Sequence, residues 1–161
     1  MPIKYFPAPD IEEKSKEIVL MLDWKHIDIE NVGFLRSTGS KSRGTIARCH
    51  ALGKAMQKAM KRKRSFYLVE VISERFDKLP DEEQVEVIIH ELMHIPKTFG
   101  GGFVHHDRVS DKAVKEVYEH YCNLKEGELD KIKKSFGDKV VEDAQSIIDD
   151  AQDFCVKRRW F

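Results

Sequence analysis

The sequence is poor in cysteine, and its cysteines lie far apart. Among 161 residues there are three, Cys49, Cys122 and Cys155, and no two of them form a C-x-x-C pair. An odd number of widely spaced cysteines argues against a disulfide framework and against a cysteine zinc ribbon. We therefore expect reduced core cysteines, as in a cytoplasmic protein.

Long apolar runs are also absent, and neither sign of charge dominates. No stretch of 18 apolar residues occurs, so we expect no contact with a membrane. The N-terminal segment MPIKYFPAPDIEEKSKE lacks the apolar region of a signal peptide. Lys plus Arg number 28, as do Asp plus Glu, which argues against a chain devoted throughout to nucleic acid or to an anionic membrane.

The chain has no internal repeat and no linker long enough to divide it. We therefore predict a single domain over residues 1–161. Residues 1–9 carry Pro2, Pro7 and Pro9 and are expected to form an extended arm. Residues 126–161 are expected to form a helical C-terminal extension.

Apolar spacing and turn residues predict a mixed α+β fold with a small sheet of about three strands. Asp10 is expected to cap the first helix, and Asp81, with Gln84 three residues later, has the signature of a capping box. Gly44 closes a polar loop that begins at Ser37. The strands are expected at 32–36, 45–52 and 66–72, and the helices at 10–24, 54–64, 81–95, 110–124, 128–135 and 138–156.

The segment HELMH at residues 90–94 matches the pattern H-E-x-x-H. A helix advances about 100° per residue, which places His94 about 40° from His90 and Glu91 about 100° away. Both imidazoles then lie over one face and can share one Zn²⁺ ion. Glu91 lies beside them, where a general base can reach a water molecule.

The other positions of this helix are largely apolar. Val85, Ile88 and Leu92 fall opposite the two histidines, and Ile89 and Met93 fall between these groups. A helix that is apolar on most sides is buried, and polar groups on a buried helix need partners. This favours a metal site over two core histidines bonded to the backbone.

A third ligand is expected because catalytic zinc usually takes three protein ligands and keeps one position open. The helix should stop at Pro96, three glycines allow a turn, and His105 and His106 follow. Adjacent residues of an extended chain point in opposite directions, so one of the two is expected to ligate. Glu116 or Glu119 on the next helix is the alternative, although both also fit a solvated helix face.

Other polar residues are weaker candidates. Tyr118 and Tyr121 fit packing better than the stabilisation of an oxyanion, a role that the sequence assigns to no residue. His50 fits a hydrogen-bonded core or edge histidine, and Asp107 is a candidate partner for a ligand histidine. His26 and His120 are expected at the surface.

The run Lys58–Arg64 is strongly basic, as is the C-terminal sequence VKRRWF. Solvated surface charge explains such runs, and a contact with nucleic acid is the functional alternative. Phe66, Tyr67 and Trp160 would take part in base stacking only with exposed rings.

The stretch HELMHIPKTFGGGFVHHD, with FLRSTGSKSRGTIARCHAL upstream, resembles the metallopeptidases of phages and archaea over about residues 30–110. The resemblance implies a zincin-like core, in which a small twisted sheet packs on the H-E-x-x-H helix. It favours His106 as the third ligand, with His105 as the rival. A more distant similarity to SprT-like zinc proteases implies the same order of strands before the metal helix.

We predict a zinc-dependent hydrolase that uses one Zn²⁺ ion to cleave a peptide or protein substrate, with Glu91 as general base. One alternative is a binding protein with a structural metal, including one associated with nucleic acid. The other is a metal-dependent hydrolase of a non-peptide bond, which uses the same metal chemistry. Other transition metals also accept imidazole ligands.

Overall fold

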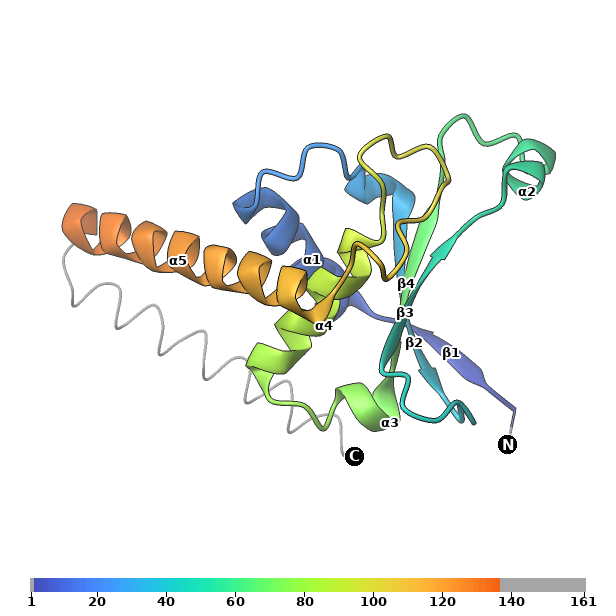
Figure 1. The fold of residues 1–161 in the computed structure, drawn as a ribbon, viewed down its shortest axis with the longest axis horizontal. Coiled ribbons are helices and arrows are strands. Elements are labelled where there is room, and N and C mark those ends of the chain that lie inside the picture. Colours follow the sequence, from blue (N-terminus) through green and yellow to red (C-terminus); the bar gives the residue numbers. More distant parts are fainter. Residues whose placement is uncertain (1, 137–161) are drawn as a thin grey trace. The chain divides into compact units, whose positions relative to one another are not determined.

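The computed structural model describes residues 2–136. It has four strands: β1 (Lys4–Pro7), β2 (Val32–Thr38), β3 (Ala47–Ala51) and β4 (Tyr67–Ile72). Its five helices are α1 (Pro9–Met21), α2 (Lys54–Ala59), α3 (Ser73–Phe76), α4 (Asp81–Met93) and α5 (Asp111–Phe136), and η1 (Ile29–Asn31) is a short 3₁₀ turn. The fold is therefore mixed α+β, as predicted (Figure 1).

Residues Met1–Tyr121 form one compact unit, and a second unit begins at Cys122. The prediction of a single domain over 1–161 stays a prediction, as does the extension over 126–161 beyond Phe136, because residues 137–161 lie outside the described part. The same holds for the helix expected at 138–156. Within the described part, no helix combines the length and apolar character needed to cross a membrane.

The strands form one sheet in the order β1-β2-β4-β3. The central pair β2 and β4 is parallel, and each edge strand is antiparallel to its neighbour. Parallel neighbours need a crossover connection, which here passes through β3 and α2. β3 is therefore an edge strand of the sheet. The basic segment Lys58–Arg64 follows β3 in the sequence.

Within the predicted arm at residues 1–9, Lys4–Pro7 form the strand β1, and Pro9 already begins α1. Lys4 pairs opposite Thr38 and Pro7 opposite Leu35, so the sheet has four strands instead of about three. Proline is tolerated because β1 lies at the edge, where a missing N–H breaks no ladder.

Both predicted side-chain caps are wrong, and in both cases proline occupies the helix start. The N-cap of α1 is Ala8 followed by proline, and the N-cap of α4 is Pro80, with no side-chain cap hydrogen bond in either helix. Proline fits the start of a helix because its missing N–H would have no intrahelical partner there. Asp10 instead pairs with Arg36, and Gln84 donates to the Leu79 carbonyl at 2.9 Å.

The helices predicted at 110–124 and 128–135 are one helix, α5. Gly127 lies inside it and does not interrupt it. A glycine inside a helix costs only about 1 kcal/mol relative to alanine, so favourable neighbours can carry the helix across it.

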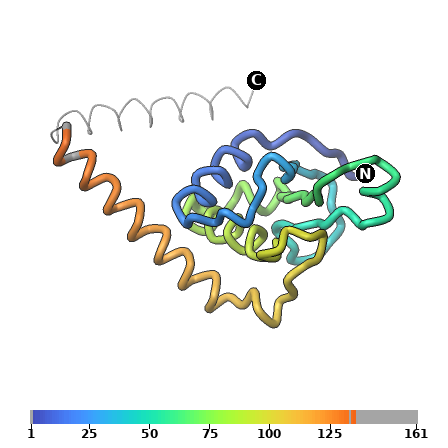
Figure 2. Tube along the Cα trace, turned by 90° about the horizontal axis from the view of Figure 1, so that it is seen from above, coloured from blue at the N-terminus to red at the C-terminus, as the bar shows by residue number. Residues whose placement is uncertain are grey.

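The core lies between the sheet and the two helices α1 and α4, which share one side of it (Figure 1). Figure 2 shows α1 running beside α4, in agreement with the contacts between them. Ile11 and Ile18 of α1 are buried, as are Ile88 and Leu92 of α4 and Val69 of β4. Each such side chain contributes roughly 1.5–3 kcal/mol through burial. This packing fixes α4 against β3.

Candidate metal centre

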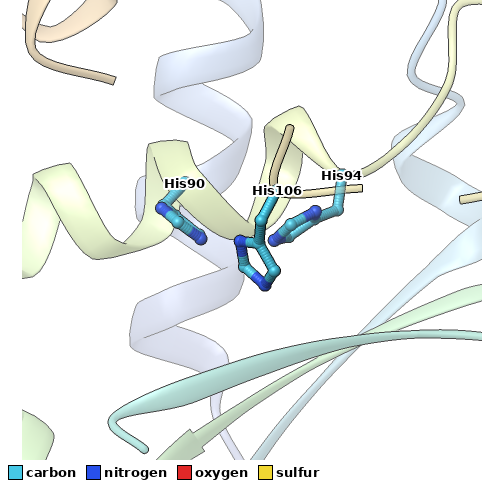
Figure 3. A group of neighbouring side chains, drawn as sticks. All are labelled: His90, His94 and His106. Carbon is cyan, nitrogen blue, oxygen red and sulfur yellow. The ribbon is translucent and has the colours of Figure 1, made fainter. Parts of the chain in front are cut away.

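Three imidazole rings from two segments meet on the C-terminal half of α4. His90 and His94 come from the helix and its last turn, and His106 comes from the loop that follows (Figure 3). One nitrogen of each ring lies within 4.8 Å of those of the others. The ring centroids are 4.9 Å apart for His90 and His94, and 4.6 Å apart for His94 and His106. Within residues 2–136 no other cluster of this kind occurs.

His94 is held by its neighbours in one orientation. It is 2% exposed, and its ring stacks on Phe103 with centroids 4.5 Å apart. Its Nδ1 lies 2.6 Å from the Val104 carbonyl oxygen, and the Val104 N–H donates to the His94 carbonyl at 2.9 Å. An Nδ1–H bonded to a carbonyl leaves Nε2 as the free nitrogen, which is how proteins orient metal-binding histidines.

The two helix histidines are biased toward the neutral form. Burial is the main cause that lowers the pKa of His90 and of His94, and the neighbouring imidazoles add to it. Asp111, at the start of α5, acts in the opposite direction on His90. A neutral imidazole has the lone pair that a metal ion needs.

Of the two adjacent histidines, His106 lies in the cluster and His105 does not. The ring of His105 contacts Phe103 instead, with centroids 5.6 Å apart. Glu116 and Glu119 are exposed and lie outside the cluster, and Glu116 is 4.0 Å from Lys112 on its own helix. The structure thus brings together His90, His94 and His106, the three histidines that the sequence analysis favoured as ligands.

Glu91 lies in the space between α4 and the edge strand β3. It is 7% exposed, and burial raises the pKa of its carboxyl to about 7. A hydrogen bond from the backbone N–H of Cys49 opposes that shift. The pKa of the Cys49 thiol is raised to about 12, first by burial and then by the charge of Glu91. A carboxyl that titrates near neutral pH is suited to proton transfer.

The weaker candidates have other partners. His50 Nε2 lies 2.8 Å from Glu70, and the Tyr121 hydroxyl donates to Glu17 at 2.6 Å. Tyr118 is half-buried, and Asp107 and His120 are exposed. His26, expected at the surface, is half-buried, and burial lowers its pKa.

The basic run contains two arginines with acceptor partners and three exposed lysines. Arg62 donates to Asn31 at 2.8 Å and lies over the Phe66 ring, and Arg64 pairs with Asp28. The lysines at 58, 61 and 63 are exposed. Tyr67 is fully buried and is not available for base stacking. The predicted contact with nucleic acid stays a prediction, and VKRRWF lies outside the described residues.

Three contributors to the centre carry no sequence motif. They are the Cys49 amide on Glu91, the Val104 backbone on His94, and the buried Tyr67, which bonds to the glycine turn. Two of the three act through the backbone, which any residue offers, so only tertiary structure reveals them.

Cys49 and Cys122 are free thiols, and Cys155 lies outside the described part.

Comparison with known proteins identifies a family for the chain. The model of the family described as "putative phage metallopeptidase" matches residues 3–136, which is most of the chain. No curated protein and no solved structure matches the chain. A metallopeptidase family implies a bound metal and a metal-dependent hydrolase, and the three-histidine cluster lies inside the matched region. The chain belongs to the phage metallopeptidase family.

Proposed function

We propose that this protein is a zinc-dependent peptidase with a zincin-like core, in which His90, His94 and His106 hold the metal. The observation that carries the proposal is the approach of three imidazole nitrogens to within 4.8 Å of one another beside a buried carboxyl. A structural metal site has no need of a buried acid next to its ligands. The acid therefore favours catalysis over a scaffold role.

The donor set fits zinc. Three neutral nitrogen ligands on one side, with a fourth position free, is the arrangement of many catalytic zinc sites. His94 also has the outer hydrogen bond, Nδ1 to a carbonyl oxygen, that such ligands usually make. When bound, the zinc ion supplies Lewis-acid polarisation of a carbonyl and makes water more acidic.

Glu91 is the proposed general base. Burial raises the pKa of its carboxyl to about 7 in the metal-free protein, and a carboxylate at this position would take a proton from water and return it to the leaving amine. The Cys49 N–H fixes one side of the carboxyl against β3. The helix spacing keeps Glu91 out of the ligand set while leaving it within one turn of both helix histidines.

Peptide bonds are the favoured substrate because the family is named for peptidases. The rival reaction, hydrolysis of a non-peptide bond, would use the same residues in the same roles. The two differ in which compounds the purified protein cleaves.

Elemental analysis of the purified protein tests the metal site. We expect one zinc ion per chain in the wild type, and a large loss of zinc in the variants His90→Ala, His94→Ala and His106→Ala. The matched control is His105→Ala, which removes a neighbouring imidazole outside the cluster. Zinc loss in His105→Ala with retention in His106→Ala would overturn the ligand assignment.

A further inference from the structure

His106, the third imidazole of the centre, lies on a loop whose composition predicts high conformational freedom. Between the end of α4 and His106 lie three consecutive glycines, Gly100 to Gly102. Glycine loses more conformational freedom on folding than any other residue. A loop of this kind places a ligand accurately only if something outside it holds the turn.

The buried hydroxyl of Tyr67 makes that connection. Tyr67 is the first residue of the central strand β4 and is 0% exposed. Its hydroxyl donates to the Gly102 carbonyl at 2.9 Å and accepts from the Gly101 N–H at 2.9 Å. Its ring also contacts that of Phe99, with centroids 4.9 Å apart. One side chain of the sheet thus satisfies two backbone groups of the glycine turn.

The turn has the backbone geometry that such a connection requires. Gly101 has a φ of 83°, in the left-handed region, and Phe99 has a φ of 46° despite its side chain. A non-glycine residue in this region costs free energy and persists only when its surroundings hold it. The hydroxyl and ring of Tyr67, a residue of the sheet, stabilise this backbone conformation.

A second connection follows two residues later, where Val104 exchanges hydrogen bonds with His94. The loop is therefore fixed at Gly101 and Gly102 by the sheet and at Val104 by a ligand histidine. Only His105 separates Val104 from His106 in the sequence.

We propose that Tyr67 is a positioning residue for the metal centre, which acts by holding the glycine turn so that His106 stays beside His90 and His94. This inference rests on the metal site of the proposed function. It requires no contact between Tyr67 and the metal. Without the hydroxyl, the turn loses two part-buried hydrogen bonds, while the ring of phenylalanine would still fill the space.

The test is the zinc affinity of Tyr67→Phe, measured by competition with a chromophoric chelator. Loss of a group that orients a ligand typically weakens metal binding about 10–100-fold, and we expect a loss in that range. The matched control is Tyr121→Phe, because Tyr121 is 3% exposed and its hydroxyl donates to Glu17, away from the loop. The control should leave zinc affinity unchanged within about 2-fold.

A double-mutant cycle separates positioning from general loosening. If Tyr67 acts through His106, then Tyr67→Phe should change zinc affinity by less than about 2-fold in a His106→Ala background. An equal loss in both backgrounds would overturn the proposal, since it would mean that Tyr67 supports the fold and not this ligand. Equal zinc affinity of Tyr67→Phe and wild type would also overturn it.

Two glycine variants keep the inference testable should Tyr67→Phe fail to fold. Gly101→Ala places a side chain at positive φ, with its Cβ 3.2 Å from Gln57 Nε2, and is expected to weaken zinc binding. Gly102→Ala meets nothing closer than Pro96 at 4.0 Å and should bind zinc like the wild type. Equal affinities in the two variants would contradict the role of the turn. A wild type that binds no zinc would instead refute the proposed function.

Discussion

Glu91 of α4 accepts a hydrogen bond from the backbone N–H of Cys49, which lies on the edge strand β3. The bond joins the only acid of the H-E-x-x-H motif to the sheet rather than to another side chain. Its partner is a backbone amide, so the bond constrains the carboxyl without a charged hydrogen-bond partner. Burial therefore dominates the pKa of Glu91 and raises it to about 7.

This raised pKa predicts how the stability of the metal-free protein depends on pH. Between pH 4.5 and about 7 the native carboxyl holds a proton that the unfolded chain has released, so stability falls as pH rises through that window. The full effect is roughly 3 kcal/mol. Urea unfolding of metal-free Glu91→Gln should show higher stability than wild type at pH 8 and little difference at pH 4.5. Glu119→Gln, at an exposed site, is the control, and a Glu91→Gln curve parallel to that of wild type would contradict the prediction.

The Cys49 thiol is predicted to resist alkylation. Its pKa is raised to about 12, so almost none of it is thiolate at pH 8, and the thiolate is the reactive form. Peptide mapping by mass spectrometry after iodoacetamide treatment should find Cys49 unmodified in the native protein and modified after denaturation. Rapid modification of native Cys49 would show that the strand edge is open to solvent.

Arg36 lies outside the metal site and is predicted to stabilise the fold. Its side chain, only 11% exposed, pairs with Asp10 at the start of α1 and with Asp77 after α3. Arg36→Met should cost about 1–2 kcal/mol in urea unfolding, because it removes a largely buried cation that pairs with two partly exposed carboxylates. Lys16→Met breaks the exposed pair with Glu12 and should cost less than about 0.5 kcal/mol. Equal costs would mean that Arg36 is no more than a surface ion pair.

Within the described residues, the exposed lysines of the basic run, Lys58, Lys61 and Lys63, are the groups through which the predicted contact with nucleic acid can be tested. Changing these three to glutamine should weaken binding to a fluorescent duplex at low salt and flatten its salt dependence, since each phosphate contact adds to that slope. Arg64→Gln, which removes a cation paired with Asp28, should have a smaller effect. Absence of binding by the wild type at low salt would end the hypothesis.

Local patterns predicted the metal helix and three of the four strands. Helix spacing alone predicted that His90 and His94 share one face, and the structure brings their rings together, because a regular helix fixes the angle between its residues. The expected strands at 32–36, 45–52 and 66–72 correspond to β2, β3 and β4. These elements have strong local signals in apolar and β-branched residues.

Features that depend on distant partners were not predictable in the same way. Residues 4–7 become a strand only because β2 offers an edge, and proline obscures the signal. The proximity of His106 to α4 depends on Tyr67 and on the Val104 backbone, which no motif marks. The predicted caps at Asp10 and Asp81 are wrong because each lies inside its helix, one residue after a proline that stands at the helix start.

The central claim is that Glu91 transfers the proton in a zinc-dependent hydrolysis. The most direct test compares Glu91→Gln with wild type, first for zinc content and then for cleavage of a peptide library followed by mass spectrometry. We predict one zinc ion per chain in both proteins and a loss of turnover of about 10²–10⁴-fold in the variant. Cleavage by zinc-loaded Glu91→Gln at the wild-type rate would contradict the account.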